Sequence, residues 1–273
     1  MTSKKYRDIT LIGKGNSGKV YKCIDVQTGH LVVIKKIYKS LNAERGVHKE
    51  YFFSKILFPL LKDNIINIKK IEEHEYYYML VSDFVDAKDM SKVNLDLPLD
   101  DKKNLALKLV RTLKYIHGAH IAHRDIKMGN ILLKEDMTPL FIDFEFSCLS
   151  EDSQSIDLND ILYGELTYRK SKAGTINNIA PEIINGGNKA DLYKADIYSM
   201  GVLLYNLFND KKFPFELDID CIKSYKIKTT TAPFPSNSGS KIVDRLVSDM
   251  MKVDPNERLS LEDAVNILEL LIS

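Results

Sequence analysis

The chain of 273 residues contains no tryptophan and only three cysteines, Cys23, Cys148 and Cys221. No pair of them has the C-x-x-C spacing of a metal or redox motif, so we interpret them as free thiols of a reducing compartment. No uninterrupted apolar run reaches transmembrane length, and the start M-T-S-K-K-Y lacks the apolar core of a signal peptide. These absences predict an intracellular protein, in the cytoplasm or the nucleus.

The charges of the chain nearly balance. Lys and Arg number 39 and Asp and Glu number 38, which gives a formal net charge of +1 at pH 7. This balance argues against a general nucleic-acid binder and against a polybasic membrane-surface protein. With 44% hydrophobic residues, the chain is long enough to form one or two globular cores.

The first part of the chain is predicted to be β-structure. Strand-like segments fill residues 6–37, and the turn signals G-K-G-N-S-G and Q-T-G separate them. The first signal contains Gly13, Gly15 and Gly18, and the residues after it alternate as in a strand. A Rossmann motif needs a helix directly after its glycines, so this segment favours a hairpin tip. Further strands are predicted at 65–71 and 76–81.

Helices are predicted after the first strands and through the second half. A helix capped by Asn42 should extend to about residue 61, with Leu60 on its buried face. Another should begin at residue 100 or 101 and end at Gly118. The segment from Asp196 to Phe208 is almost wholly apolar, which predicts a buried helix. The residues S-L-E-D at 260–263 predict a capping box for the last helix.

The chain is organised around I-A-H-R-D-I-K-M-G-N at 121–130, followed by F-I-D-F-E at 141–145. These segments carry the carboxylates of Asp125 and Asp143, the ammonium of Lys127 and the amide of Asn130. Asp125 is suited to accept a hydroxyl proton, and Lys127 is suited to neutralise phosphate charge. Carboxylate and amide oxygens are ligands that Mg²⁺ takes together with phosphates. The four residues therefore predict phosphoryl transfer, in which positioning and charge stabilisation do most of the catalysis.

The same segment resembles the catalytic loop of the eukaryotic-type protein kinases, H-R-D-x-K-x-x-N followed by D-F. V-V-I-K, ending at Lys35, and A-P-E at 180–182 match that family in the same order, and Lys127 favours its Ser/Thr branch. The resemblance implies an α+β, bilobal fold and one protein kinase domain over residues 1–273. Residues 1–84 would form a small antiparallel β-sheet lobe with one key helix, and residues 85–273 a larger, mainly helical lobe.

The resemblance further implies a binding site for ATP between the lobes. Lys35 would contact the α- and β-phosphates, and Glu50, preferred over the competing Glu44, would hold Lys35 in place. The loop over the phosphates would comprise Ile12, Gly13, Gly15, Gly18 and Val20.

The hinge of the family resembles S-D-F-V-D-A-K-D at 82–89. By this resemblance, backbone groups of Asp83 and Val85 would contact adenine, and the small Ser82 would stand at the back of the pocket. Asp89 would accept hydrogen bonds from the ribose hydroxyls.

For the reaction, the resemblance assigns Asp125 as the catalytic base and Lys127 as the group that stabilises the transferring γ-phosphoryl. Asn130 and Asp143 would hold Mg²⁺, with Mn²⁺ as an alternative ion. Glu145 departs from the family, because glycine usually follows D-F there. Glutamate restricts the backbone more than glycine does, which predicts that the inward position of Asp143 is favoured. Impaired catalysis and no effect are the alternatives.

Residues 146–179 resemble an activation segment and substrate platform. Ser171, four residues before Thr175, stands where the family carries an activation phosphosite, and Arg124 would receive that phosphate. An ordinary loop serine is the alternative. Thr175 resembles the residue that bridges Asp125 and Lys127 in Ser/Thr kinases.

Three more residues receive structural roles from the resemblance. Asp196 would cap its helix and brace the backbone of the catalytic loop. Arg258 would form an ion pair with Glu182 of the A-P-E motif.

Two other functions compete with an active protein kinase. A pseudokinase would bind nucleotide and partners without efficient transfer, but such proteins usually lack the equivalent of Lys35, Asp125 or Asp143. A small-molecule kinase of the aminoglycoside type generally lacks A-P-E and the loop lysine, whereas this chain has both. The implied partners are protein substrates with Ser or Thr acceptors and separate regulatory proteins, with no nucleic acid and no membrane segment indicated.

Overall fold

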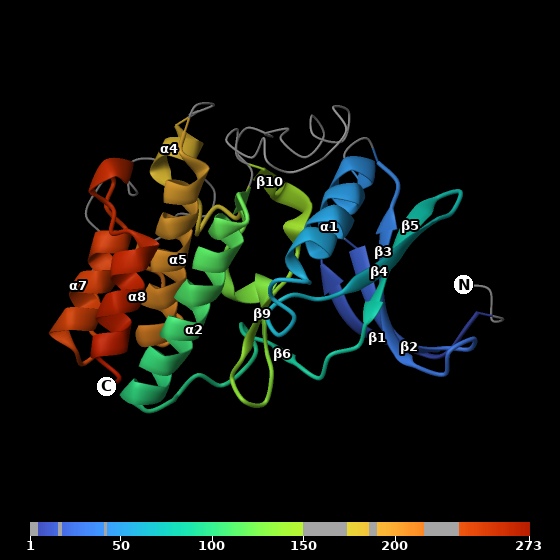
Figure 1. The fold of residues 1–273 in the computed structure, drawn as a ribbon, viewed down its shortest axis with the longest axis horizontal. Helices are drawn as coiled ribbons and strands as arrows, with labels where there is room; N and C mark the ends of the chain where they lie inside the picture. Colours follow the sequence, from blue (N-terminus) through green and yellow to red (C-terminus); the bar gives the residue numbers. More distant parts are fainter. Residues whose placement is uncertain (1–4, 16–17, 41–42, 150–173, 186–189, 216–234) are drawn as a thin grey trace.

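The computed structural model describes residues 5–15, 18–40, 43–149, 174–185, 190–215 and 235–273. Two lobes lie side by side along the long axis of the molecule, and Figure 1 shows the β-rich lobe with the N-terminus on the right. The helical lobe and the C-terminus lie on the left. The predicted α+β, bilobal architecture is confirmed.

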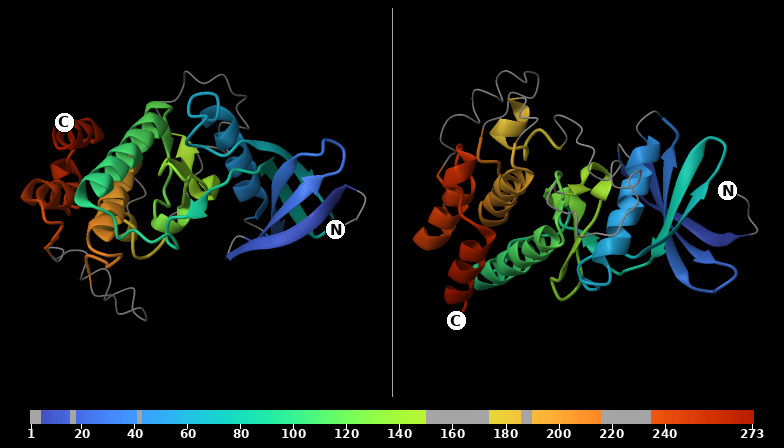
Figure 2. Two further views of the ribbon diagram at one scale, coloured as in Figure 1. Left: turned by 90° about the horizontal axis from the view of Figure 1, so that it is seen from below. Right: turned by 45° about the horizontal axis from the view of Figure 1, so that its top comes forward.

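The smaller lobe is a five-stranded antiparallel sheet with one helix against it. The strands are β1 (Tyr6–Gly15), β2 (Gly18–Asp25), β3 (Leu31–Tyr38), β4 (Ile68–Glu73) and β5 (Tyr77–Asp83), in the order β1-β2-β3-β5-β4. The glycine-rich segment therefore connects two strands, as a hairpin requires. The helix α1 (Ala43–Leu57) lies beside this sheet, on the side of the other lobe (Figures 1 and 2).

The end of α1 differs from the sequence-based expectation. The helix ends at Leu57, and Leu60 is 67% exposed, so the prediction of a buried Leu60 is wrong. The apolar residues Phe53 and Leu57 complete the buried face, and the chain then turns through F-P-L, where Pro59 cannot donate a helical hydrogen bond. Asn42, the expected cap, lies outside the described residues.

The larger lobe consists mainly of helices. They are α2 (Leu99–Gly118), α4 (Pro181–Ile184), α5 (Leu192–Phe208), α7 (Lys241–Met250) and α8 (Leu261–Leu270), with the 3₁₀ turn η3 (Pro255–Glu257) before α8. The helix α2 begins one or two residues before the predicted start and ends at Gly118 as predicted, and Ser260 accepts a hydrogen bond from the Asp263 N–H at the start of α8. Figure 2 shows α2, α5, α7 and α8 packed side by side.

The helix α5 forms the centre of this lobe. All of its residues except Tyr193 and Lys194 are buried, as expected for a segment that is apolar on all sides. Asp191 caps it by accepting hydrogen bonds from the N–H groups of Tyr193 and Lys194. The expectation that Asp196 caps this helix is therefore wrong, because Asp196 lies in its second turn.

Two small sheets of short strands belong to the larger lobe. One sheet has the order β6-β8-β9, with β6 (Lys88–Asp89), β8 (Ile131–Leu133) and β9 (Pro139–Phe141), and β7 (Ile121–Ala122) pairs with β10 (Cys148–Leu149). Two 3₁₀ turns, η1 (Met128–Asn130) and η2 (Phe144–Phe146), precede β8 and follow β9. These elements position Asn130, at the end of η1, and Asp143, directly before η2.

Two of the three cysteines, Cys23 and Cys148, are buried free thiols, and Cys221 lies outside the described residues. Among the helices that the structure describes, none combines the length and the apolar character that crossing a membrane would require. The intracellular location stays a prediction.

Candidate active site

Lys35 links the smaller lobe to the segment that carries Asp143. Its Nζ lies 2.7 Å from Glu50 Oε2, on α1, and 2.9 Å from Asp143 Oδ1, just after β9. Lys35 and Glu50 are therefore paired as predicted, and Glu44 is not the partner of this lysine. Burial alone would lower the pKa of Lys35, but the two carboxylates outweigh it and the pKa is raised, so the ammonium stays charged. Burial raises the pKa of Glu50, and Lys35 opposes that shift.

Asp125 accepts three side-chain hydrogen bonds. Lys127 Nζ donates to Asp125 Oδ2 at 2.6 Å, Asn130 Nδ2 donates to the same oxygen at 2.7 Å, and Thr175 Oγ1 donates to Oδ1 at 2.7 Å. Lys127 Nζ also lies 2.6 Å from Thr175 Oγ1, so Thr175 bridges Asp125 and Lys127 as the resemblance implied. Burial opposes ionisation of Asp125, but Lys127 and Thr175 outweigh it and lower the pKa of the carboxyl. Asp125 is therefore an ionised acceptor at neutral pH.

Asp196 fixes the backbone that carries Asp125. From inside α5, its two carboxylate oxygens accept the N–H of His123 at 2.7 Å and the N–H of Arg124 at 2.8 Å. His117 Nε2 lies 3.1 Å from the same carboxylate. Arg124 has φ = 69°, in the left-handed region, which non-glycine residues rarely adopt. The buried carboxylate thus holds a strained turn, and the predicted bracing role of Asp196 fits these contacts.

The β8–β9 hairpin places Asn130 beside Asp143. Asn130 precedes β8 and Asp143 follows β9, and the Ile142 N–H donates to the Asn130 carbonyl at 3.0 Å. Asp143 has φ = 67°, and Phe144 after it packs its ring 4.7 Å from that of His123. The second carboxylate oxygen of Asp143 and the amide oxygen of Asn130 suit a hard cation that also binds phosphates. Among the described residues no cluster of three His, Cys, Asp or Glu side chains could hold a metal ion by itself.

Where β2 begins, its backbone lies close to β3, the strand that carries Lys35. Gly15 pairs with Gly18, and Gly18 has φ = 141°. A Cβ on Gly18 would lie 2.2 Å from the Lys36 carbonyl oxygen, so no other residue fits there without movement. Val20 pairs with Lys35 across β2 and β3 and lies on the same face of the sheet. The predicted phosphate loop is thus next to the lysine, and its first residues, Ile12 and Gly13, lie in β1.

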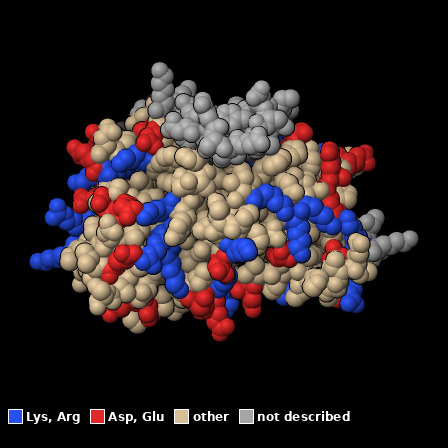
Figure 3. Space-filling model, in the orientation of Figure 1, with Lys and Arg blue, Asp and Glu red and all other residues tan. Residues whose placement is uncertain are grey.

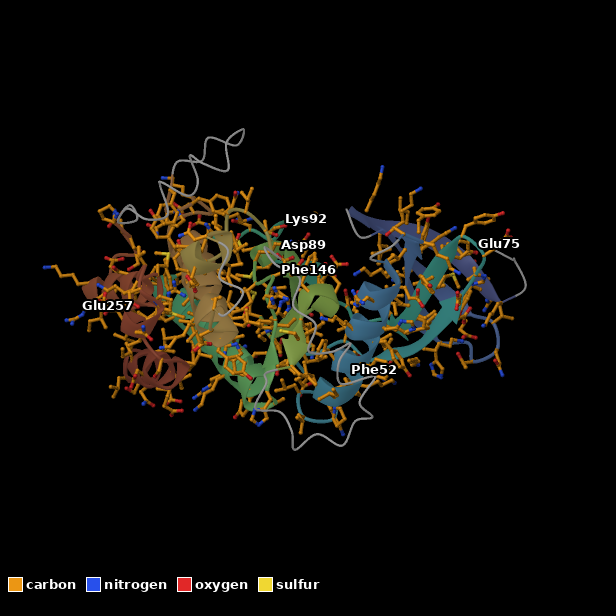
Figure 4. The ribbon with its side chains drawn as sticks, turned by 90° about the horizontal axis from the view of Figure 1, so that it is seen from above. Phe52, Glu75, Asp89, Lys92, Phe146 and Glu257 are labelled. Atoms are coloured by element: carbon orange, nitrogen blue, oxygen red, sulfur yellow. The ribbon has the colours of Figure 1, made fainter. Side chains whose placement is uncertain are left out.

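The predicted hinge residues follow β5. Asp83 is the last residue of that strand, and its carboxylate is bound by Lys69 at 2.6 Å. The Val85 N–H donates no hydrogen bond within the described part of the chain, and its contact with adenine stays a prediction. Asp89 accepts from Ser91 and pairs with Lys92 at 3.1 Å. Figure 4 shows Asp89 and Phe146 in the region where the lobes meet, between Glu257 in one lobe and Glu75 in the other.

Arg258 and Glu182 form the bidentate ion pair that the resemblance implied. The two guanidinium nitrogens lie 2.6 and 2.7 Å from the two carboxylate oxygens. Arg258 also donates to the carbonyls of Lys194, Lys252 and Val253. Arg258 therefore ties the A-P-E segment to α5 and to the residues that directly follow α7.

The sequence-based prediction missed Lys49. This residue is buried, and its Nζ donates to the Ser147 carbonyl at 2.9 Å, which ties α1 to the segment after Asp143. Its position four residues before Phe53, on the buried face of the helix, was the available signal.

Ser171 lies outside the described residues, so the phosphosite stays a prediction. Arg124, its expected partner, donates to the Phe146 carbonyl at 3.3 Å.

Comparisons with known proteins identify the same family as the motifs and contacts described above. The model of the family described as protein kinase domain matches residues 6–268. The chain belongs to the protein kinase family. The kinase domain is 32% identical over 268 residues to "Probable serine/threonine-protein kinase CCRP1" of Zea mays, covering 96% of this chain and 40% of that protein.

Two further relatives have about the same sequence identity to this chain. Calcium-dependent protein kinase 4 of Plasmodium berghei (strain Anka) is 30% identical over 282 residues, which cover 96% of this chain and 49% of that protein. R436 of Acanthamoeba polyphaga mimivirus, whose name describes a serine/threonine-protein kinase, is 30% identical over 266 residues, with 93% of this chain and 89% of R436 covered. The chain spans less than half the length of the first two relatives. The names of these relatives and the family match confirm the predicted membership in the Ser/Thr branch.

Glu145 of the kinase domain lies against α1. Gly46 on that helix is so near that a Cβ on it would be 3.5 Å from the Glu145 Cβ. The adjacent Asp143 is in its inward position, beside Lys35. Whether Glu145 favours that position stays a prediction.

The substitution Glu145→Gly should loosen the turn η2. Glycine in an ordered turn costs about 1 kcal/mol of backbone entropy, which corresponds to roughly a fivefold shift in the local opening equilibrium. Amide hydrogen exchange of residues 143–149 should therefore be about fivefold faster, since exchange follows local opening. The control is Glu135→Gly, at an exposed residue of the β8–β9 turn. Unchanged exchange in the 143–149 amides would contradict a restraining role for Glu145.

Proposed function

We propose that the kinase domain transfers the γ-phosphoryl group of Mg²⁺-bound ATP to Ser and Thr hydroxyls of protein substrates. The observation that carries this proposal is the Asp125–Lys127–Thr175 network. In it a threonine hydroxyl already donates to the Asp125 carboxylate at 2.7 Å, and the Lys127 ammonium lies beside both groups. A substrate hydroxyl at the same carboxylate would be oriented for attack and would give up its proton there.

Each residue of the site then has a distinct role. Lys35, held by Glu50, would bind the α- and β-phosphates, and Lys127 would stabilise charge on the transferring group. Asn130 and Asp143 would hold Mg²⁺, which when bound neutralises phosphate charge. Since Lys35, Asp125 and Asp143 are present and arranged as transfer requires, a pseudokinase is not favoured.

Labelled ATP and a generic protein substrate test the proposal. After incubation with the purified chain, hydrolysis of the substrate should yield labelled phosphoserine and phosphothreonine. Label on phosphotyrosine alone would overturn the assignment to Ser and Thr hydroxyls. No label in the substrate, while a fluorescent ATP analogue binds normally, would favour the pseudokinase.

Removal of the divalent ion should abolish this transfer. A chelator should stop it, and addition of Mg²⁺, or of Mn²⁺ in a second arm, should restore it. Asp143→Asn should lower kcat by roughly a hundredfold or more, because a metal ion supplies several kcal/mol of charge stabilisation. Asp136→Asn, at an exposed position of the same hairpin, is the control and should keep its rate. Equal rates for the two variants would exclude Asp143 as a metal ligand.

A further inference from the structure

Three lysines form a row across the β-rich lobe. Lys14 on β1 pairs directly with Lys19 on β2, and Lys19 pairs directly with Lys36 on β3. Directly paired residues of antiparallel strands share one face of the sheet, so the three side chains lie on the same face. Adjacent strands are about 4.8 Å apart, so the row extends for roughly 10 Å.

This row lies on the face of the sheet that does not form the active site. The next residue across from Lys36 is Met79 on β5, which belongs to the small core cluster with Tyr6, Cys23 and Ile34. Lys35, one residue before Lys36, points to the opposite face and contacts Glu50 and Asp143. The three lysines are therefore separate from the phosphate-binding lysine of the cleft.

The charges of the row are not compensated. Within the described residues, no ion pair involves Lys14, Lys19 or Lys36, although like charges directly opposite each other destabilise a sheet. The acid at the far end of the row, Glu72, is already bound by Lys5 at 2.6 Å and by Lys70 at 3.1 Å. Figure 3 shows both basic and acidic side chains over the two lobes on the face that it draws.

Aromatic rings hold one end of the row in place. Lys36 Nζ lies 3.7 Å from the centre of the Tyr77 ring, and His74 is stacked on that ring at 4.5 Å. The Lys36 ammonium and the His74 ring both lie too close to Tyr77 to share one face of its ring. Each therefore covers a different face of Tyr77. No face remains on Tyr77 for a nucleobase to stack on.

We propose that Lys14, Lys19 and Lys36 bind an extended segment of a partner protein rich in Asp and Glu. The partner is identified by charge, because three uncompensated ammonium groups call for several anionic groups. A single phosphate is less suitable, since the three lysines stand on three successive strands and none is an arginine with its forked guanidinium. Three or four residues of extended chain span the same distance, at about 3.3 Å per residue. This inference does not depend on the proposed transfer activity.

Fluorescence anisotropy with labelled peptides tests the inference. The probes are an Asp/Glu-rich peptide, its Asn/Gln counterpart, a peptide with one phosphoserine and a short oligothymidylate. The proteins are the wild type, the triple variant Lys14→Gln/Lys19→Gln/Lys36→Gln, and a control with the same charge change, Lys62→Gln/Lys212→Gln/Lys241→Gln. The control lysines are exposed and form no ion pair within the described residues. A thermal melt of each protein verifies folding.

The wild type should bind the Asp/Glu-rich peptide, and the row variant should bind it roughly tenfold more weakly, a change of about 1.4 kcal/mol. The control should bind like the wild type, and added salt should weaken binding. Single Lys→Gln variants, each expected to lose about two- to threefold, replace the triple variant if it fails to fold. Equal affinities of row and control variants would overturn the proposal, as would preference for the phosphopeptide or for the oligothymidylate.

Discussion

Replacing Asp125 by asparagine should lower kcat for phosphoryl transfer by about 10²–10⁴-fold, the range over which a positioned general base contributes. The asparagine amide cannot accept a proton from the substrate hydroxyl. It also turns an N–H₂ group toward Lys127, Asn130 or Thr175, all of which donate to Asp125. The measurement is a steady-state assay with labelled ATP and a saturating protein substrate.

Two control measurements show whether the loss of kcat is specific to the Asp125 carboxylate. Affinity for a non-hydrolysable ATP analogue should stay within about threefold of the wild type, since transition-state interactions change kcat and not ground-state binding. Asp63→Asn, where the side chain is 86% exposed and lies 3.4 Å from Lys134, should keep its kcat. If Asp125→Asn transferred phosphate as fast as the Asp63 variant, Asp125 would not be the base.

The largest expected change in stability comes from Arg258→Met. The Arg258 side chain is 0% exposed, and its substitution leaves the Glu182 carboxylate and three backbone carbonyls without their donor. Removing one partner of a buried ion pair typically lowers the free energy of unfolding by about 3–5 kcal/mol. Urea denaturation should show a lower midpoint with an unchanged m-value.

Arg245→Met is the matched control for this substitution. That arginine is 85% exposed and lies 3.5 Å from Asp249, in a surface pair of a kind worth about 0–1 kcal/mol. The free energy of unfolding should therefore change by less than about 1 kcal/mol. If Arg258→Met were no more destabilising than Arg245→Met, the buried pair would not hold the A-P-E segment in place.

Much of the site could be predicted because its chemistry lies in short, contiguous motifs. Asp125, Lys127 and Asn130 occur within six residues of chain, and Asp143 follows after one hairpin. The pairing of Lys35 with Glu50 could also be predicted, because the family resemblance supplies the long-range contact. The resemblance could not decide whether Glu145 restrains the turn, since that depends on local free energies.

Other features depend on details that the sequence pattern does not contain. Asp191 and Asp196 are both acidic residues near the start of α5, and only the position of the first turn decides which one caps the helix. Leu60 fits the apolar spacing, but Pro59 ends the pattern before it. The lysine row depends on strand register, because a shift of one residue would move Lys36 to the other face.

The position of Asp196 in the chain has a consequence for how the protein is made. Asp196 lies 72 residues after Arg124, whose N–H it binds. A nascent chain that has emerged from the ribosome only as far as Asp143 contains Lys35, Asp125 and Asp143 but not the acceptor for the two loop amides. The strained turn at Arg124 then lacks its support. The supported form of this loop is thus expected to arise late in translation, after the buried central helix has been synthesised.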